Sequence, residues 1–438
     1  MTAGLFAAVL EPWTRRRAWG LLATVVFLGM VLRALAVVAL GSPLESDELA
    51  YHSMAINLLG GQGVVDFMGN RAMYNVGYPL FVIVPLFAVV GDHVAALHAL
   101  QVVLGGVTVV LVYALVRTAG AGRGAAVLAA AAWSFYVPAM TMAESVLKEN
   151  LQVPLMLGLM MAMLHLARVP GWRPALAVGV AFGLLALVGN SALSLALAVP
   201  VALWLAWKRQ RGDAASAVAP TRAALGYAVL IAVAAGAIAA PWMWRNAQQI
   251  GAPVLNTNGG FNLYLGNNPA ATGRFVSIAD TPMAPRWEAL RREGEVLASE
   301  TLRQEALAWV RANPGRFFEL VVQKAVWFWS PPESKPGIGR LEALVRMVWS
   351  AQFVVLAAVA AVGTLLMWRH LPRGAWVLWA GVLGYWVAHL PFYVLTRYRE
   401  PVMPLVAAIA AIVLVAAVAA WRRGAASAAT RRGLSSAR

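Results

Sequence analysis

Apolar residues in this chain come in long runs, separated by short polar or charged segments. A helix rises about 1.5 Å per residue, so an apolar run of about 20 residues spans the roughly 30 Å of hydrocarbon in a bilayer. Run length therefore matters more here than periodicity, and it predicts an all-α integral membrane protein. The predicted membrane helices cover 20–40, 94–116, 124–141, 147–167, 174–189, 191–207, 223–243, 343–367, 375–395 and 402–421.

The first apolar run, Leu21–Leu40, follows the basic cluster Arg15–Arg17. A cleavable signal peptide has a shorter apolar stretch and a small-residue cleavage site. We therefore interpret this run as a retained first membrane helix.

Basic clusters lie at alternate ends of the apolar runs. The positive-inside rule assigns these clusters to the cytoplasm and predicts that both termini are cytoplasmic, in keeping with an even number of spans. Only Glu11 and Asp213 among the acidic residues fall on that side. The basic segments are Arg15–Arg17, Arg117 with Arg123, Arg168 with Arg173, Lys208–Arg222, Arg369 with Arg373, and the tail from Arg422.

Two long external segments remain between the spans. In the first, 41–93, the apolar piece 78–90 is too short to cross a bilayer, which favours a re-entrant or interfacial element. In the second, 244–342, Asn and Gly from Asn256 to Gly273 indicate tight turns. An aromatic piece, 317–330, is expected to lie along the interface, because crossing would place the next basic loop on the wrong side.

An amphipathic helix is also expected in the second external segment, ending near Pro314. Its apolar positions are Trp287, Leu290, Leu297, Leu302, Leu307 and Trp309. The predicted organisation is therefore an N-terminal transmembrane catalytic module over 1–243, an external region over 244–342, C-terminal membrane helices over 343–421 and a basic cytoplasmic tail over 422–438.

The amino-acid composition excludes several kinds of site and partner. The chain is 61% hydrophobic and 12% charged, whereas soluble domains are about half apolar and a quarter charged. It has no cysteine, which excludes disulfides, thiolate metal sites and a cysteine nucleophile. The net charge of +16 is gathered at helix ends as topology signals, so no nucleic-acid partner is predicted.

Three carboxylates, Glu45, Asp47 and Glu48, open the first external segment. One interpretation is structural: Asp47 caps the following helix and its neighbours favour the first helical turn. The other is functional: one carboxylate is a general base whose pKa is tuned by burial and by like charges. Glu48 and His52 are four residues apart, so they share a helical face and can hydrogen-bond or hold a metal.

A second acidic spot lies at the external start of the fourth predicted helix. Glu144 can interact with the exposed amides of that helix end, and Lys148, four residues on, can pair with it. Lys148 and Glu149 already enter the apolar run, and ionisable residues inside a membrane are candidates for function. Glu149 can also simply neutralise a basic neighbour.

Arginines on the external side are unexpected under the positive-inside rule. Each can be explained by snorkelling to lipid headgroups. As a set they also suit a phosphate, which an arginine fork binds with two hydrogen bonds. These residues are Arg33, Arg71, Arg245, Arg397 and Arg399.

Carboxylates and phosphate-binding cations beside a bilayer suit transfer of a group from a lipid phosphate to an acceptor. A carboxylate deprotonates the acceptor, and cations stabilise the leaving phosphate. Other motifs are weak: Gly259-Gly260 and Gly266 do not form a Walker loop, no His-Glu-x-x-His occurs, and His93 and His98 are interpreted as structural.

At these residues the sequence resembles the GT-C superfamily of polytopic glycosyltransferases, in the branch of the protein O-mannosyltransferases and the lipid A aminoarabinose transferase. Order and topology together carry the resemblance. The matching residues are Asp47-Glu48, Tyr78-Pro79-Leu80-Phe81, Ala143-Glu144-Ser145, Pro241-Trp242 with Arg245-Asn246, Thr257-Asn258-Gly259-Gly260-Phe261-Asn262-Leu263 with Gly266-Asn267-Asn268-Pro269, and Arg397-Tyr398-Arg399 with Pro401 and Pro404.

The resemblance implies a GT-C bundle of about 10–12 helices and a sugar donor on a polyprenyl monophosphate. It implies that Asp47 is the base with Glu48 beside it, and that Glu144 places the acceptor or a divalent ion such as Mg or Mn. The possible metal ligands are Asp47, Glu48, His52 and Glu144. The implied donor-phosphate contacts are Arg397, Arg399, Arg71, Arg245 and Arg33, and the substrate contacts are Tyr74, Tyr78, Lys148, Asn262 and Tyr398.

One departure concerns the outer end of the fifth helix, where many relatives have an arginine and this chain has Gly189-Asn190-Ser191. One phosphate or sugar contact is therefore lost or moved. The external region of about 100 residues is also small, which favours a lipid-linked, glycan or other small acceptor over a folded protein.

The sequence thus predicts an inverting glycosyltransferase of the bacterial inner membrane, acting on the periplasmic side among membrane lipids. Two alternatives stay open. A glycolipid transporter or flippase should show inverted repeats and charges near the midplane, whereas these charges collect at the outer rim. A non-catalytic assembly subunit would not need Asp47.

Overall fold

The computed structural model describes residues 13–41, 43–212, 218–332 and 339–435. These residues are overwhelmingly helical, and their only β-type pairing is a bridge between Arg274 and Val394. Seven of the described helices are long and apolar enough to cross a membrane. The predicted all-α, multi-pass membrane architecture is confirmed.

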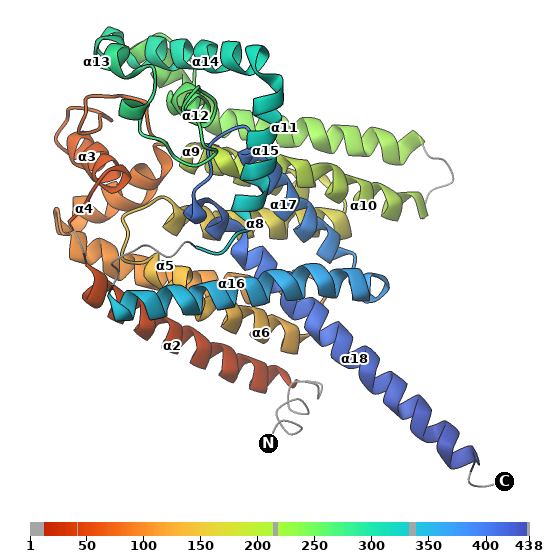
Figure 1. Cartoon of the computed structure of the whole chain (residues 1–438). Helices are drawn as coiled ribbons and strands as arrows, with labels where there is room; N and C mark the ends of the chain where they lie inside the picture. The colour runs from red at the N-terminus through yellow and green to blue at the C-terminus, as the bar shows by residue number, and fades with distance from the viewer. Residues whose placement is uncertain (1–12, 42, 213–217, 333–338, 436–438) are drawn as a thin grey trace.

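Long helices lie side by side in one bundle (Figure 1). They match the ten predicted membrane segments in order and approximate position. The bundle elements are α2 (Arg15–Leu40), α5 (Val94–Ala119), α6 (Arg123–Ser134) with α7 (Val137–Thr141), α8 (Glu149–Arg168), α9 (Trp172–Val188), η2 (Asn190–Ala198) with α10 (Val199–Gly212), α11 (Val218–Ile250), α16 (Arg340–Met367), α17 (Gly374–His389) and α18 (Met403–Ser435).

Small residues let some of these helices approach closely. In α9, a Cβ on Gly179 would meet the carbonyl oxygen of Ile231 at 2.7 Å, and a Cβ on Gly183 would meet that of Ala235 at 2.9 Å. Both contacts face α11, its main packing partner. Close approach of backbones through glycine is the usual basis of helix packing in lipid, where apolar burial gives little drive.

Shorter elements gather at one end of the bundle. The first external segment forms α3 (Asp47–Leu59), a π-helical turn η1 (Pro79–Ile83) and α4 (Val84–Val90). The second forms α12 (Asn258–Gly266), the 3₁₀ turn η3 (Ile278–Asp280), α13 (Ala284–Glu293), α14 (Glu295–Ala312) and α15 (Pro314–Phe328). In Figure 1, α15 runs across the direction of the long helices.

Three predicted helices have different bounds in the structure. The helix expected over 124–141 breaks at Tyr136, which is extended before Val137-Pro138. The helix expected over 375–395 ends at His389, two residues before Pro391, as proline favours. The single amphipathic helix expected to end near Pro314 is two helices, because Gly294 takes φ +127° between α13 and α14.

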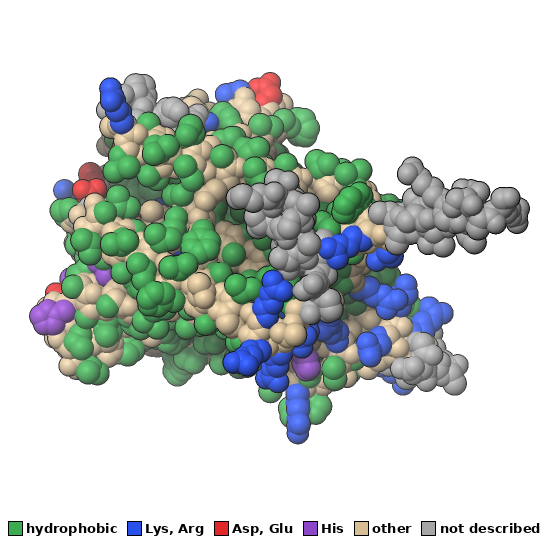
Figure 2. Space-filling view, turned by 90° about the horizontal axis from the view of Figure 1, so that it is seen from below, with side chains coloured by type: hydrophobic (Ala, Val, Ile, Leu, Met, Phe, Trp, Pro, Cys, Tyr) green, Lys and Arg blue, Asp and Glu red, His purple; other side chains and the backbone are tan. Residues whose placement is uncertain are grey.

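Connections predicted to share a side do meet. A Cβ on Gly120, after α5, would touch Arg168 of α8 and Pro372 before α17. Figure 2 shows most Lys and Arg side chains of this face toward the right of the view, which is the end of α10 and α11 joined by the grey trace in Figure 1. Acidic side chains lie toward the left and upper edge of the view, with a few basic ones beside them. The last short 3₁₀ elements, η4 (Trp368–His370) and η5 (Thr396–Val402), lead into α17 and α18 respectively.

Candidate active site

A cavity of about 830 Å³ opens where the short external elements meet the bundle. Its walls come from the start of α3, the first external segment, the start of α8, the start of η2, α12 to α14, and the chain from α17 to η5. The volume lies within the usual range for small-molecule sites, about 300–1,000 Å³. Segments far apart in the sequence therefore build one polar and aromatic chamber.

Asp47 and Arg397 form an ion pair in this cavity. The Arg397 Nη2 donates to Asp47 Oδ2 at 2.5 Å, although the residues are 350 positions apart. Ser46, directly before Asp47, has φ +50° and is the only described residue other than glycine with positive φ. Such strained backbone tends to occur at functional sites.

Asp47 is not a helix cap. Ser46 occupies the N-cap position of α3 and makes no side-chain capping bond, while Asp47 is the first helical residue and directs its carboxylate to Arg397. Tyr51 and Tyr74 also line the cavity, and their rings meet edge to face with centroids 5.7 Å apart. Burial raises the pKa of both tyrosine hydroxyls most strongly, and the nearby Asp47 charge raises it further. Both side chains therefore stay neutral and keep a proton to donate.

Glu48 and Glu144 do not line the cavity. Glu48 Oε1 accepts from the backbone amide of Val146 at 3.0 Å and thereby holds the turn before α8. Burial raises the pKa of Glu48, and the hydrogen bond from the Val146 amide opposes this shift. Ser145 donates to Glu144 at 3.2 Å.

Lys148 and Glu149 both line the cavity. Lys148 sits at the N-cap position of α8, and the expected pairing with Glu144 is not formed. Among the described residues, no carboxylate or carbonyl is bonded to its ammonium group. A cation of this kind is available to a substrate anion.

Arg399 points away from the cavity, which is a correction to its predicted place. It is fully buried, donates to the carbonyls of Phe328 (3.2 Å) and Ser330, and stacks over Phe353 at 3.7 Å. Its nearest carboxylate is Glu400, at 3.4 Å. Arg399 therefore fastens η5 to the end of α15.

The remaining predicted phosphate contacts also lie outside the cavity lining. Arg33 is buried and donates to the carbonyls of Gly29 and Ser134, at 3.0 and 3.3 Å. Arg245 donates to the carbonyls of Arg71 and Val64, at 2.9 and 3.0 Å. These contacts hold neighbouring segments together and direct both guanidinium groups to backbone carbonyls outside the cavity.

Arg71 belongs to a junction between the two external segments. Its side chain is bonded to Gln249, and its backbone amide donates to Glu295 Oε1 at 2.8 Å. Glu295, which lines the cavity, also accepts from the amide of Ala72 and from the hydroxyl of Thr257 at 2.8 Å. This carboxylate, which the sequence analysis missed, organises the cavity wall.

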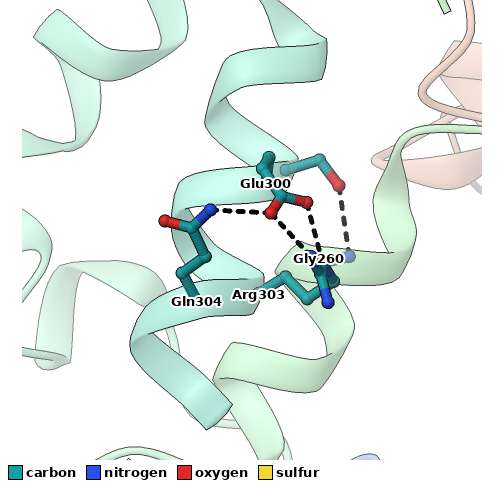
Figure 3. Close-up of polar contacts among 5 residues, drawn as sticks. Gly260, Glu300, Arg303 and Gln304 are labelled. Atoms are coloured by element: carbon teal, nitrogen blue, oxygen red, sulfur yellow. Dashed lines mark hydrogen bonds and ion pairs between the residues drawn. The ribbon is translucent and has the colours of Figure 1, made fainter. Parts of the chain in front are cut away.

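The α12–α14 contact forms another part of that wall. Figure 3 shows Gly260 close to α14, where its amide donates to the Ser299 hydroxyl at 3.2 Å. A Cβ on Gly260 would stand 1.8 Å from the Ser299 carbonyl oxygen, so only glycine fits. On the outer side of α14, Glu300 accepts from Arg303 and Gln304.

Among the predicted substrate contacts, Tyr74, Lys148, Asn262 and Tyr398 line the cavity. Tyr78 does not, because it is buried and its hydroxyl donates to Gln101.

Several lining residues were not predicted from the sequence. Asn256 donates to Asn75 Oδ1, and Asn75 donates to Asn190 Oδ1, both at 3.0 Å. The sequence indicated Asn190 only as part of a segment that departs from the GT-C resemblance, which implies an arginine there. Other unpredicted lining residues include polar and aromatic side chains from separate segments, which only the fold brings together: Ser191, Ser194, Trp287, Tyr385, His389 and Tyr393.

The possible metal ligands are not assembled. His52 pairs with Asp92 at 2.7 Å and not with Glu48, whose carboxylate faces Val146. The described residues contain no group of three His, Cys, Asp or Glu able to hold a metal. The four predicted ligands therefore do not form one cluster among the described residues.

No family model and no curated protein matches the chain in sequence. In structure it is similar to the oligosaccharyltransferase of Archaeoglobus fulgidus, seen in a crystal structure of its complex with Zn and sulfate. The TM-score is 0.53 and the identity 14%, over 90% of this chain and 48% of that one. The fold is the GT-C fold.

The predicted GT-C fold is thereby confirmed, whereas the predicted branch is not distinguished at this identity. The chain spans about half the length of the oligosaccharyltransferase chain.

Proposed function

We propose that this GT-C protein is an inverting glycosyltransferase that takes a sugar from a polyprenyl-monophosphate donor. The observation that carries the proposal is the Asp47–Arg397 pair, a carboxylate and a guanidinium brought into one cavity from opposite ends of the chain. The shared fold with an oligosaccharyltransferase supports glycosyl transfer as the chemistry.

In the proposed reaction, Asp47 removes the proton from an acceptor hydroxyl or amine. The acceptor atom attacks the anomeric carbon from the face opposite the phosphate. The bond between that carbon and the phosphate oxygen breaks, and its electron pair leaves with the phosphate, so the configuration inverts. General-base assistance of this kind contributes about 10²- to 10⁴-fold.

Two cations support the leaving phosphate in this scheme. Arg397 exchanges Asp47 for the donor phosphate as substrates bind, which releases the carboxylate to act as base. Lys148, which has no partner among the described residues, supplies the second positive charge. Fixed cations where charge grows in the transition state are a main source of enzymatic rate.

The proposed setting is the bacterial inner membrane, with the cavity on the periplasmic side and both termini in the cytoplasm. Basic connections at one end of the bundle and the carboxylate-lined cavity at the other support this orientation under the positive-inside rule. The proposed acceptor is a lipid-linked, glycan or other small molecule that fits the cavity.

The test is Asp47→Asn, assayed for transfer of labelled sugar from a synthetic polyprenyl-monophosphate sugar to cell-envelope lipid and glycan fractions. We expect a loss of about 10²-fold or more, because amide replacement removes the base but keeps the shape. Asp92→Asn is the control, since Asp92 pairs with His52 outside the cavity. Unchanged transfer in Asp47→Asn would refute the assignment.

The transporter and assembly-subunit alternatives are tested with the same variant. Protein in liposomes that moves a fluorescent polyprenyl glycolipid between leaflets, equally well with Asp47→Asn, would favour transport. Normal cellular glycan in the Asp47→Asn strain would favour an assembly role.

A further inference from the structure

Beside the main cavity lies a separate chamber of about 10 Å³, deep between α2, α5 and α8. That volume is close to the space a single water molecule occupies. Arg33 and Glu149 both line this chamber, and Glu149 also lines the main cavity. Glu149 therefore forms part of the wall between them.

Each of these two charged groups has one buried atom without a hydrogen-bond partner. On Arg33 the atom is Nε, a donor, and on Glu149 it is Oε2, an acceptor. Unpartnered charges inside a protein are costly, and buried groups normally find a partner or a water. One water that accepts from Nε and donates to Oε2 would satisfy both.

The surrounding packing is shaped for the Arg33 side chain. A Cβ on Gly105 would stand 2.5 Å from Arg33 Nε, and one on Gly29 would stand 2.9 Å from Arg33 Nη1. Two glycines on different helices thus make room for one guanidinium. Its Nη1 is already engaged by the Gly29 and Ser134 carbonyls, which aims the rest of the group at the chamber.

Three other polar groups around the chamber are already engaged. Gln101 donates to the carbonyl of Ala143 and accepts from Tyr78, and Thr108 donates to the carbonyl of Leu104. Asn150 donates to three carbonyls at the start of α8. Trp133 Nε1, which also lines the chamber, is a second buried donor without a partner. Glu149 Oε2 is the one unpartnered acceptor among the described lining residues, and a water that donates to it has two lone pairs for the two donors.

We propose that Arg33 and Glu149 form a water-bridged ion pair and that Arg33 thereby positions Glu149 as a second substrate-contacting carboxylate of the main cavity. Arg33 is then a positioning residue, and Glu149 accepts a hydrogen bond from the acceptor. The substrate-contact part rests on the proposed function, whereas the ion pair does not.

The ion pair is tested by thermal unfolding in detergent of Arg33→Met, Glu149→Gln and the double variant. Each single change leaves an uncompensated buried group, so each should lower the midpoint by several degrees. The double variant should lose clearly less than the sum of the singles. Pairing Arg33→Met with Glu144→Gln is the matched control, expected to be additive because Glu144 does not line the chamber.

If the losses of the two single variants simply add in the double variant, the ion pair is overturned. A high-resolution structure in which the two groups touch directly, or face other partners, would overturn it too.

The substrate contact is tested by kinetics on the glycosyl-transfer reaction. Glu149→Gln should change kcat or KM for the acceptor and leave KM for the donor unchanged, and Arg33→Lys should restore part of the loss in Arg33→Met. Equal effects on both substrates would overturn the substrate contact and leave the ion pair standing. The Asp47→Asn variant tests only the proposed function. Its result does not change the interpretation of the Arg33–Glu149 ion pair, which the unfolding experiments test separately.

Discussion

Arg397 and Arg399 are two residues apart in η5 and have opposite environments. Arg397 faces Asp47 in the cavity, whereas Arg399 is enclosed by carbonyls, the Phe353 ring and Glu400. A 3₁₀ helix has about three residues per turn, so side chains two positions apart point about 120° from each other. Within one turn, Arg397 therefore faces the cavity and Arg399 stabilises the fold.

We predict that Arg397→Ala and Arg399→Ala fail in different ways. Losing one charged hydrogen bond to the donor phosphate should cost Arg397→Ala about ten- to a hundredfold in kcat/KM for the donor, with little change in unfolding. Arg399→Ala leaves Glu400 buried without its cation and should lose about 3–5 kcal/mol of stability. Steady-state kinetics and thermal unfolding in detergent distinguish the two, and a stable Arg399→Ala with a raised donor KM would contradict the assignment.

Lys324 is a buried cation with a dependence on pH. It donates to the carbonyl of Gly266 at 3.0 Å and to Asn267 Oδ1 at 3.2 Å. Burial lowers the pKa of Lys324 from 10.5 to about 8. Between these values the unfolded chain binds the proton more tightly than the folded one, so this group makes stability rise as pH rises.

The corresponding prediction compares the wild type with Lys324→Met. The difference between their unfolding midpoints should shift in favour of the wild type from pH 7.5 to pH 9.5, as measured by scanning fluorimetry in detergent. Parallel pH profiles for the two proteins would contradict it.

At the scale of elements, the external helices are held by close contacts and by a few polar junctions. Glu295 joins the first external segment to α14, Lys324 joins α15 to α12, and Gly260 lets α12 lie against α14. Because few contacts hold these helices in place, losing any one of them should destabilise the external region. A glycine at such a contact should therefore not tolerate substitution.

Gly259 and Gly260 provide a matched pair for this point. Gly260→Ala places a methyl group against the Ser299 carbonyl and should cost about 1–3 kcal/mol as overpacking, with reduced transfer because the cavity wall shifts. A Cβ on Gly259 would meet nothing within 4 Å, so Gly259→Ala should unfold like the wild type. Equal melting of the two variants would show that α12 does not depend on this approach.

At the scale of the whole molecule, the bundle has two chemically different ends. One end carries the basic connections, and the other carries the cavity. Charge asymmetry of this kind sets the orientation of a polytopic protein during insertion.

The predicted orientation can be measured directly because the chain has no cysteine. In spheroplasts, a membrane-impermeant maleimide should label Phe67→Cys, an exposed position in the first external segment. Gly122→Cys, exposed in the α5–α6 connection, should be labelled only after the membrane is opened. The opposite labelling pattern would invert the proposed topology.

The sequence by itself determined the membrane class, the order of the helices and which connections share a side. Those properties depend on run length and local charge, which are readable along the chain. Helix ends were less accurate where a single residue decides the geometry, as at Gly294 and before Pro138.

Only the tertiary structure decided which charges face the site. Adjacent side chains on a helix point about 100° apart, so Asp47 enters the cavity while Glu48 turns to Val146. The partner of Asp47 lies 350 residues away, and the partners of Arg33, Arg245 and Arg399 are mostly backbone carbonyls on other segments. Such long-range contacts leave no local pattern in the sequence. The sequence could therefore identify the candidate charged residues but could not show which of them line the cavity and which only stabilise the fold.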